Sequence, residues 1–277
     1  MKRADIIILA GQSNAVGVGH IKCLKRHFSD EKIKEYFDGY ENVKINYYSH
    51  DKKSNGFVKT TVNCTEISKD TLGPEVGMAE YFTEKYPDKE LFIVKCAFGG
   101  TNLANDWLSP SSGANFSYEE TKGCNIHSSG RLVGWCYNEL VKILGDSIED
   151  LKSKGYEPEI KAFCWMQGES DAGSFDSLEK YLLKYDNLLN DIRDLFGEYM
   201  TDCEYVDAGI SERWKLYREM NENKKEYALS HKNHFFVDTV GACLTTLNEP
   251  VEEPDTAHYD SDSTLKLGRL FAEKIKL

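Results

Sequence analysis

The residue types needed for ester chemistry lie near the two ends of this sequence. Ser13 follows the apolar run Ile6–Ala10, and Asp255 precedes His258 by three residues. A serine hydroxyl becomes a good nucleophile when an imidazole takes its proton, and a carboxylate then fixes the tautomer of that imidazole. The D-x-x-H spacing lets one short turn position both partner groups. Acyl transfer is therefore the first chemistry to consider, beside the alternative that Ser13 or Asn14 only caps a helix.

Acyl transfer also needs hydrogen-bond donors for the oxyanion that forms in the transition state. Suitable donors are the backbone amides of Ser13 and a glycine, together with a neutral side-chain amide. Gly99 and Gly100 follow the strand-like run 91–98, and Gln167 follows the run 159–166. In open parallel sheets the carboxyl ends of the strands meet at one edge, where ligands bind. We therefore expect these groups to converge with the Asp255–His258 pair.

Two carboxylates beside Gln167 allow other interpretations. Glu169 and Asp171 could form a glycosidase-like pair, but two residues apart at the end of a strand they can face different ways. We favour a structural role, in which Glu169 accepts hydrogen bonds that hold the Gln167 loop. A metal site made of Glu169, Asp171, Asp255 and His258 is not supported by dense histidine or cysteine spacing, so no metal is expected.

Aromatic and imidazole groups elsewhere are less specific. Asp106 and Trp107 could line a sugar site, because an aromatic face suits a pyranose, or Trp107 could simply pack beside its loop. The other histidines have no paired carboxylate context, and we expect surface or structural roles for them; they are His20, His27, His50, His127, His231 and His234.

The elements that must position these groups alternate between strand and helix. Strand-like runs lie at residues 5–10, 42–48, 91–98, 159–166, 203–208 and 234–239. Helical patterns lie at residues 74–86, about 134–154, 177–196, about 211–230 and 261–276. This alternation predicts a mainly parallel sheet covered on both faces by helices. Two stretches, 20–70 and 108–130, do not follow it, and the second is too long for a tight turn.

Composition limits the class of protein. The 277 residues suit one domain, 1–277, with a substantial core, and no run is long enough to cross a bilayer. A net charge of −12 argues against nucleic acid or an anionic membrane as partner. The eight cysteines include no C-x-x-C pair and are typical of reduced thiols. The short run Ile6–Ala10 lacks a signal-peptide cleavage pattern, so a cytoplasmic location is expected.

Four ordered blocks carry a resemblance to a known superfamily. They are GQSN around Ser13, FGGTNLANDW from Phe98, WMQGESD from Trp165, and DTAHYDS followed by LGRLFAE in the last 23 residues. Together they resemble the SGNH hydrolases, and among these the carbohydrate acetylesterases related to sialate O-acetylesterases and acetyl xylan esterases. The similarity extends from about residue 5 to 275. It implies a three-layer α/β/α sandwich with a flavodoxin-like, mainly parallel sheet, and a site without the G-x-S-x-G elbow of other hydrolases.

The resemblance also implies roles for individual residues. Ser13 would be the nucleophile, His258 the general base and Asp255 the carboxylate that orients it. The oxyanion hole would use the amides of Ser13 and Gly100, or alternatively Gly99, with Gln167 at the place of the superfamily's asparagine. Further substrate-binding or supporting positions would be Gln12, Asn14, Gly99, Thr101, Trp107 and Glu169.

The function expected from the resemblance is removal of O-acetyl groups from carbohydrates through an acyl-enzyme, with no metal or organic cofactor. The substrate would be a small-molecule or oligosaccharide acetyl ester. One alternative is an SGNH lipase-type esterase of simple or lipid esters, although no lid-like apolar segment is evident. Another is a carbohydrate-binding domain that kept the scaffold and lost activity, although all four blocks are present.

Overall fold

The computed structural model describes residues 2–62, 71–114 and 130–277 of the chain. Its main sheet has the strand order β10-β9-β8-β1-β7-β3-β4, with β5 paired to β3. The six strands from β10 to β3 are parallel, and β4 and β5 are antiparallel to β3. The strands are β1 (Lys2–Gly11), β3 (Tyr40–Ser49), β4 (Lys52–Lys53), β5 (Val58–Thr60), β7 (Leu91–Ala97), β8 (Tyr156–Met166), β9 (Glu204–Ala208) and β10 (His234–Val237). A small antiparallel pair joins β2 (Gly19–His20) to β6 (Thr71–Leu72).

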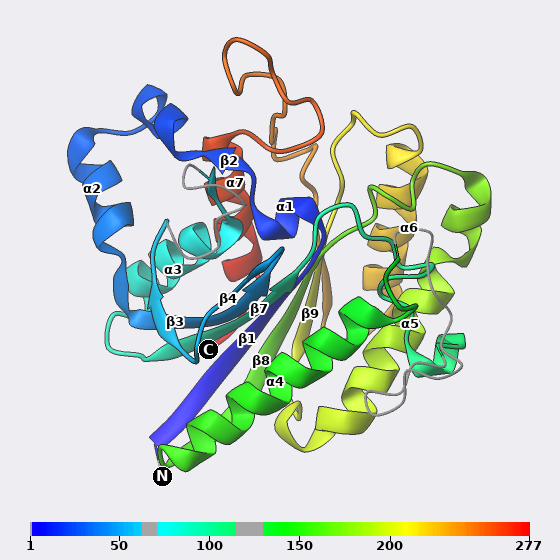
Figure 1. Ribbon diagram of the computed structural model, residues 1–277, viewed down its shortest axis with the longest axis horizontal. Coiled ribbons are helices and arrows are strands. Elements are labelled where there is room, and N and C mark those ends of the chain that lie inside the picture. Colours follow the sequence, from blue (N-terminus) through cyan, green and yellow to red (C-terminus); the bar gives the residue numbers. More distant parts are fainter. Residues whose placement is uncertain (1, 63–70, 115–129) are drawn as a thin grey trace.

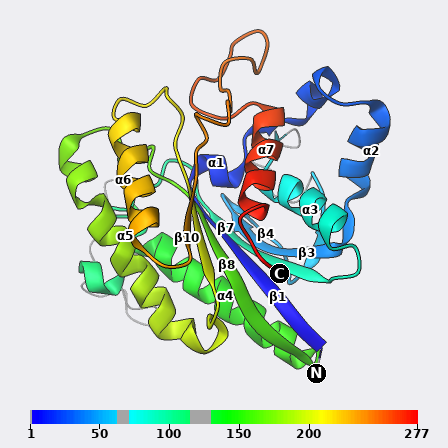
Figure 2. The same ribbon diagram turned by 180° about the vertical axis from the view of Figure 1, so that it is seen from behind.

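Helices cover both faces of this sheet, as the alternating pattern predicts. The α-helices are α1 (Ser13–Val16), α2 (Asp30–Asp38), α3 (Pro74–Lys85), α4 (Trp135–Ser153), α5 (Phe175–Phe196), α6 (Tyr217–Ser230) and α7 (Ser261–Ala272). Short 3₁₀ turns are η1 (Ile21–Arg26), η2 (Pro110–Ser112) and η3 (Gly197–Tyr199). Figure 1 shows α4 and α5 in front of the sheet, and Figure 2 shows α3 and α7 on the opposite face. The three-layer α/β/α class is thus confirmed.

The local sequence explains why these elements form. In β1 the run Ile6–Ala10 is fully buried, as expected for a central parallel strand covered on both faces. In α5 the buried stripe predicted at three- and four-residue steps includes Leu178, Tyr181 and Tyr185. That helix starts where Ser174 accepts a hydrogen bond from Ser177 N at 3.3 Å, an N-cap that satisfies one free backbone donor.

Helix boundaries differ from the sequence expectation in two places. The predicted helix 211–230 begins only at Tyr217, which leaves residues 211–216 as a loop at the sheet edge. The predicted helix 261–276 ends at Ala272. The stretch 20–70, which did not follow the pattern, contributes η1, α2 and the antiparallel edge strands. Part of it, 63–70, and most of 108–130, namely 115–129, lie outside the described residues.

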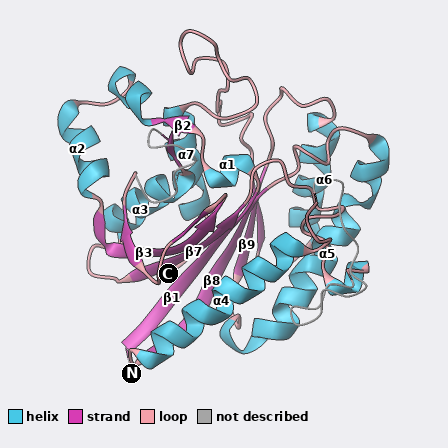
Figure 3. Cartoon of the chain, viewed as in Figure 1, coloured by secondary structure: helices cyan, strands magenta, loops and turns pink. Residues whose placement is uncertain are grey.

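The register of the paired strands places the ends of β1, β7 and β8 at the same edge of the sheet. Gly11, the last residue of β1, is paired with Ala97 of β7 on one side and with Met166 of β8 on the other. The residues that follow each strand therefore emerge side by side at the upper edge of the sheet in Figure 3. Gly11 has a positive φ of 145°, and a Cβ there would lie 1.9 Å from Met166 O, so only glycine fits this approach.

Two further expectations concern the whole chain. Among the described residues no helix is both long enough and apolar enough to span a membrane. Six cysteines in this part of the chain are free, and all but Cys243 are buried. Cys64, Cys124 and His127 lie outside the described residues.

Candidate active site

Ser13 lies at the point where β1 turns into α1. It is buried, with 8% of its surface exposed, and it is the first residue of the helix. The preceding Gln12 is fixed by a hydrogen bond from its backbone N–H to Met166 O at 2.9 Å. The backbone N–H groups of a first helical turn have no partner within the helix, so Ser13 N is a free donor as far as α1 is concerned. The hydroxyl and the backbone amide of Ser13 are thus both held at the junction between β1 and α1.

The second part of the site is the loop before α7. Asp255 Oδ2 lies 2.5 Å from His258 Nδ1, and its other oxygen accepts a hydrogen bond from Ala257 N at 2.9 Å. Burial acts to raise the pKa of Asp255, but these hydrogen bonds outweigh it and the pKa is lowered. An ionised Asp255 holds the proton on Nδ1 and leaves Nε2 of His258 as the acceptor. The paired groups are then arranged as a base and its orienting carboxylate.

Asn14 connects this loop to the serine. Its Oδ1 accepts a hydrogen bond from Tyr259 N at 3.1 Å, and its Nδ2 donates to Glu169 Oε1 at 2.7 Å. The residues next to Ser13 and His258 are therefore in direct contact. No hydrogen bond joins Ser13 Oγ to the His258 ring in this part of the structure, which is common for catalytic pairs before substrate binds.

The glycines after β7 lie beside Ser13 and form another wall of the candidate site. A side chain on Gly99 would start 3.8 Å from Ser13 Cβ and 3.9 Å from His50 Nδ1. Gly100 is exposed and has a φ of 70°, a left-handed conformation that favours glycine. Gly99 thus lies beside Ser13, and Gly100, the next residue, has open space where a side chain would start. His50, for which the sequence predicted a surface or structural role, is exposed at this wall and also has a positive φ of 55°.

Gln167 lies below Ser13 and is fully buried. Its Nε2 donates to Asp171 Oδ2 at 2.6 Å, with Gln12 Oε1 at 3.2 Å and Thr101 O at 3.3 Å also within reach. Burial raises the pKa of Asp171, although the hydrogen bonds from Leu103 N and Gln167 act to lower it. Gln167 therefore links the blocks after β1, β7 and β8. Its role as an oxyanion donor stays a prediction, because both N–H groups already face these acceptors.

Trp107 and Thr101 support the loop after β7. Trp107 is fully buried, and its Nε1 donates to Thr101 Oγ1 at 2.9 Å, while Thr101 Oγ1 donates to Phe98 O at 2.7 Å. Asp106 Oδ2 accepts from Asn102 N at 3.0 Å. Of the two roles considered for Trp107, packing matches this placement, since its indole presents no exposed face to a sugar.

Charged groups are buried beneath these residues. Lys224 of α6 is fully buried, pairs with Asp207 at 2.8 Å, and donates to Gln167 O at 2.6 Å. Burial raises the pKa of Asp207 to about 6, and it also raises the pKa of Glu169. We call this set the floor of the site; it comprises Gln167, Glu169, Asp171, Asp207 and Lys224. We call the set nearer to solvent the rim; it comprises His50, Gly100, Asp255 and His258.

A second buried ion pair supports α1 from the other side. Lys95 of β7 and Glu75 of α3 are almost completely buried and lie 2.6 Å apart. Lys95 Nζ also donates to Val16 O, the last residue of α1, at 2.7 Å. Because breaking a buried pair leaves an uncompensated charge, these groups constrain the helix that carries Ser13.

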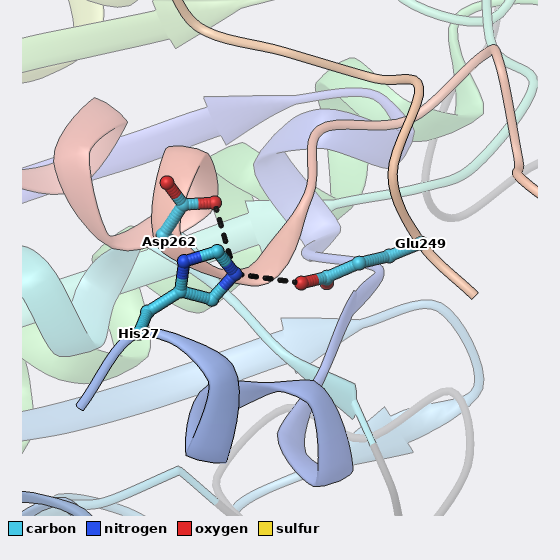
Figure 4. Close-up of side chains that lie close together, drawn as sticks. All are labelled: His27, Glu249 and Asp262. Carbon is cyan, nitrogen blue, oxygen red and sulfur yellow. Dashed lines mark hydrogen bonds and ion pairs between the residues drawn. The ribbon is translucent and has the colours of Figure 1, made fainter. Parts of the chain in front are cut away.

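The loop that carries Asp255 is anchored at Glu249. Figure 4 shows His27 Nε2 close to Glu249 Oε1, at 3.2 Å, and to Asp262 Oδ1, at 3.8 Å. These three side chains could supply ligands to a metal ion. The Glu249 carboxylate, however, already accepts hydrogen bonds from Ser261 N at 2.7 Å and Ser261 Oγ at 2.9 Å. Because Asp255 N donates to Glu249 O at 2.8 Å, the cluster holds the loop that carries Asp255 against η1.

The structure thus brings all the residues chosen from the sequence to one edge of the sheet. Sequence reasoning missed two buried lysines that support them, Lys95 and Lys224. A signal existed for each of them. Lys95 interrupts an otherwise apolar strand run, and Lys224 stands between Met220 and Ala228 at four-residue steps on the buried stripe of α6. His50, a rim residue near Gly99 that the sequence did not select, carries no such local signal.

Comparisons with known proteins identify the family of the chain. A family model described as carbohydrate esterase, sialic acid-specific acetylesterase, matches residues 3–276. A search of curated proteins returned no match.

Several solved structures share the fold at low sequence identity. NanS is 16% identical, with a TM-score of 0.68, over 98% of this chain and 96% of that one. A protein from Arabidopsis thaliana is 18% identical, with a TM-score of 0.64, over 99% of this chain and 97% of that one. A carbohydrate acetylesterase from Xanthomonas citri is 12% identical, with a TM-score of 0.62; the match covers 98% of this chain but 55% of that one.

Proposed function

The chain belongs to the carbohydrate esterase family of sialic acid-specific acetylesterases and is a carboxylic ester hydrolase, and we propose that it removes O-acetyl groups from carbohydrates with Ser13, His258 and Asp255. The observation that supports this proposal is the hydrogen bond from Tyr259 N to Asn14 Oδ1, because it joins the residue after His258 to the residue after Ser13.

The first half of the reaction forms an acyl-enzyme. Ser13 Oγ attacks the acetyl carbonyl carbon while its proton moves to His258 Nε2, and a tetrahedral oxyanion forms. The bond between the carbonyl carbon and the sugar oxygen then breaks, and His258 returns the proton to that oxygen. Asp255 stabilises the imidazolium throughout these steps. The products of this half are the deacetylated sugar and acetyl-Ser13.

Water completes the cycle in the second half. His258 takes a proton from the water that attacks acetyl-Ser13, and the collapse of the second tetrahedral species releases acetate and regenerates the hydroxyl. In both halves the oxyanion is stabilised by the backbone amides of Ser13 and Gly100 in this proposal. Gln167 can join them only by exchanging one of its present hydrogen bonds for the oxyanion.

The proposed substrate rests on the family, and the proposed location rests on the cysteines. We propose an acetylated carbohydrate as substrate and a cytoplasmic location, which the set of free, mostly buried cysteines in the described ranges supports. Cell fractionation with a tagged full-length chain tests the location.

A substrate panel tests the activity. Purified protein is assayed with acetyl, butyryl and octanoyl esters, and then for acetate release from O-acetylated sugars, including sialates. We expect kcat/KM to be highest for acetyl esters. A lipase-type site would instead gain about 1 kcal/mol or more for each added methylene, so a maximum at octanoyl would overturn the sugar-acetate proposal.

Labelling tests the nucleophile independently of the substrate. A fluorophosphonate should add one adduct on Ser13, and Ser13→Ala should lose roughly a million-fold in kcat. The matched control is Ser170→Ala, at a neighbouring strand end, which should still be labelled. Near-normal turnover by Ser13→Ala would show that another residue attacks the ester.

A further inference from the structure

Glu169 occupies an unusual position for a carboxylate. It is 1% exposed, and it lies on the loop directly after β8, under α1. One of its oxygens accepts the hydrogen bond from Asn14 Nδ2 at 2.7 Å. The other, Oε2, is buried without a hydrogen-bond partner in the described structure. An incompletely solvated carboxylate of this kind is costly, so its presence calls for an explanation.

The hydrogen bonds of Asn14 connect Glu169 to the loop that carries His258. Glu169 fixes the Nδ2 end of the Asn14 amide, and the Oδ1 end then faces Tyr259 N. Tyr259 directly follows His258, so the hydrogen bonds Glu169–Asn14–Tyr259 connect the loop after β8 to the backbone next to His258. These contacts join residues that are 155 and 245 positions apart in sequence.

His258 also lies within electrostatic range of Glu169 and favours the ionised form of that carboxyl, to a smaller extent than the hydrogen bond from Asn14 does. Asp255, the direct partner of His258, has a side chain that is 35% exposed, so water screens its charge. Glu169 is screened far less because it is buried.

We propose that Glu169 is a positioning residue that holds Asn14 and keeps a second negative charge beneath the catalytic histidine. This role rests on the proposed function, since it assigns His258 as the base. The imidazolium that forms during acyl transfer is then stabilised from two sides, by Asp255 at the rim and by Glu169 from the floor.

Other charged groups face Glu169 and set its state. Lys224 from α6 and His258 from the catalytic loop favour its ionised form, as does the hydrogen bond from Asn14, while burial opposes it. Asp207 from β9 and the hydroxyls of Tyr181 and Tyr259 also interact with it electrostatically. The cation of Lys224 pairs directly with Asp207 at 2.8 Å and acts on Glu169 through space.

Two substitutions separate charge from hydrogen bonding. Glu169→Gln keeps an oxygen that can accept from Asn14 but removes the charge. We expect the midpoint of the kcat/KM–pH profile to move to lower pH, because a nearby negative charge favours the protonated imidazole. Its plateau kcat should fall about threefold to tenfold, because the imidazolium that forms in the transition state loses part of its stabilisation. Glu169→Ala also frees Asn14, and fluorophosphonate labelling of Ser13 should slow by about 100-fold.

The control is a buried carboxylate elsewhere. Asp191→Asn removes a carboxylate on α5 that is 9% exposed and accepts a hydrogen bond from Ser111 N at 2.9 Å. It should leave the midpoint unchanged. The ring protons of His258, followed by NMR during a pH titration, give the same midpoint without any turnover. An unmoved titration in Glu169→Gln overturns the inference, whereas wild-type protein that cleaves no acetyl ester overturns the proposed function.

Discussion

The floor and the rim of the site differ in how far water reaches them. The floor residues are 0–4% exposed, and their charges are balanced by one another and by hydrogen bonds to the strand ends. The Asp255 and His258 side chains on the rim are 35% and 25% exposed and belong to a loop. The floor is therefore part of the protein core, and changes there should affect stability and activity together. Changes at the rim should affect activity with little effect on stability.

Asp255→Asn should give the largest change at the rim. Asparagine keeps the shape but loses the charge that stabilises the imidazolium and holds its tautomer, so we expect kcat to fall by roughly 10⁴-fold. Urea unfolding should give nearly the same free energy as wild type, since the side chain is partly exposed. A loss of stability comparable with that of a core substitution would contradict the distinction between rim and floor.

Lys224→Met should give the largest change in the floor. It leaves Asp207 buried without its cation and removes the hydrogen bond to Gln167 O. We expect the free energy of unfolding to fall by about 3–5 kcal/mol. The control is Lys225→Met, the next residue along α6, which is exposed and should change stability by less than about 0.5 kcal/mol. Equal effects of the two substitutions would mean that Lys224 does not stabilise the floor.

Asp207 should produce a smaller, pH-dependent effect. Burial raises its pKa to about 6, compared with about 3.9 in an unfolded chain. Between these pH values Asp207 is protonated more often in the folded protein than in the unfolded chain. Its contribution to the free energy of unfolding is therefore greatest below about pH 4 and is lost as pH rises to about 6. The decrease from this group is at most about 3 kcal/mol.

Asp207→Asn should remove that contribution. Urea unfolding of both proteins at several pH values between 4 and 7 measures the difference in slope. Glu169 and Asp171, whose pKa values burial also raises, remain in the variant and keep part of the decrease. Identical slopes in the two proteins would show that Asp207 does not titrate in this range.

The sequence by itself determined the framework of this protein. Alternating apolar runs and amphipathic stripes predicted the parallel sheet and its two helical layers, because burial on both faces of a strand needs a continuous apolar run. Ser13, Gly100 and Gln167 could be chosen from the same pattern. Each of them follows a predicted parallel strand, and the carboxyl ends of such strands meet at one edge of the sheet. The pairing of Asp255 with His258 is local in sequence, and a short turn was enough to predict it.

Only the tertiary structure decided how these residues are supported. The hydrogen bond from Asn14 to Glu169, and that from Tyr259 to Asn14, join distant segments, so no local pattern specifies them. Trp107 was equally compatible with a sugar site and with the core until its burial placed it in the core. Lys224 looks like any lysine in sequence, and its role depends on the carbonyl oxygens and the carboxylate that packing brings around it. Periodicity reports which face of an element is buried, whereas the partner of a buried polar group is fixed by how the elements pack together.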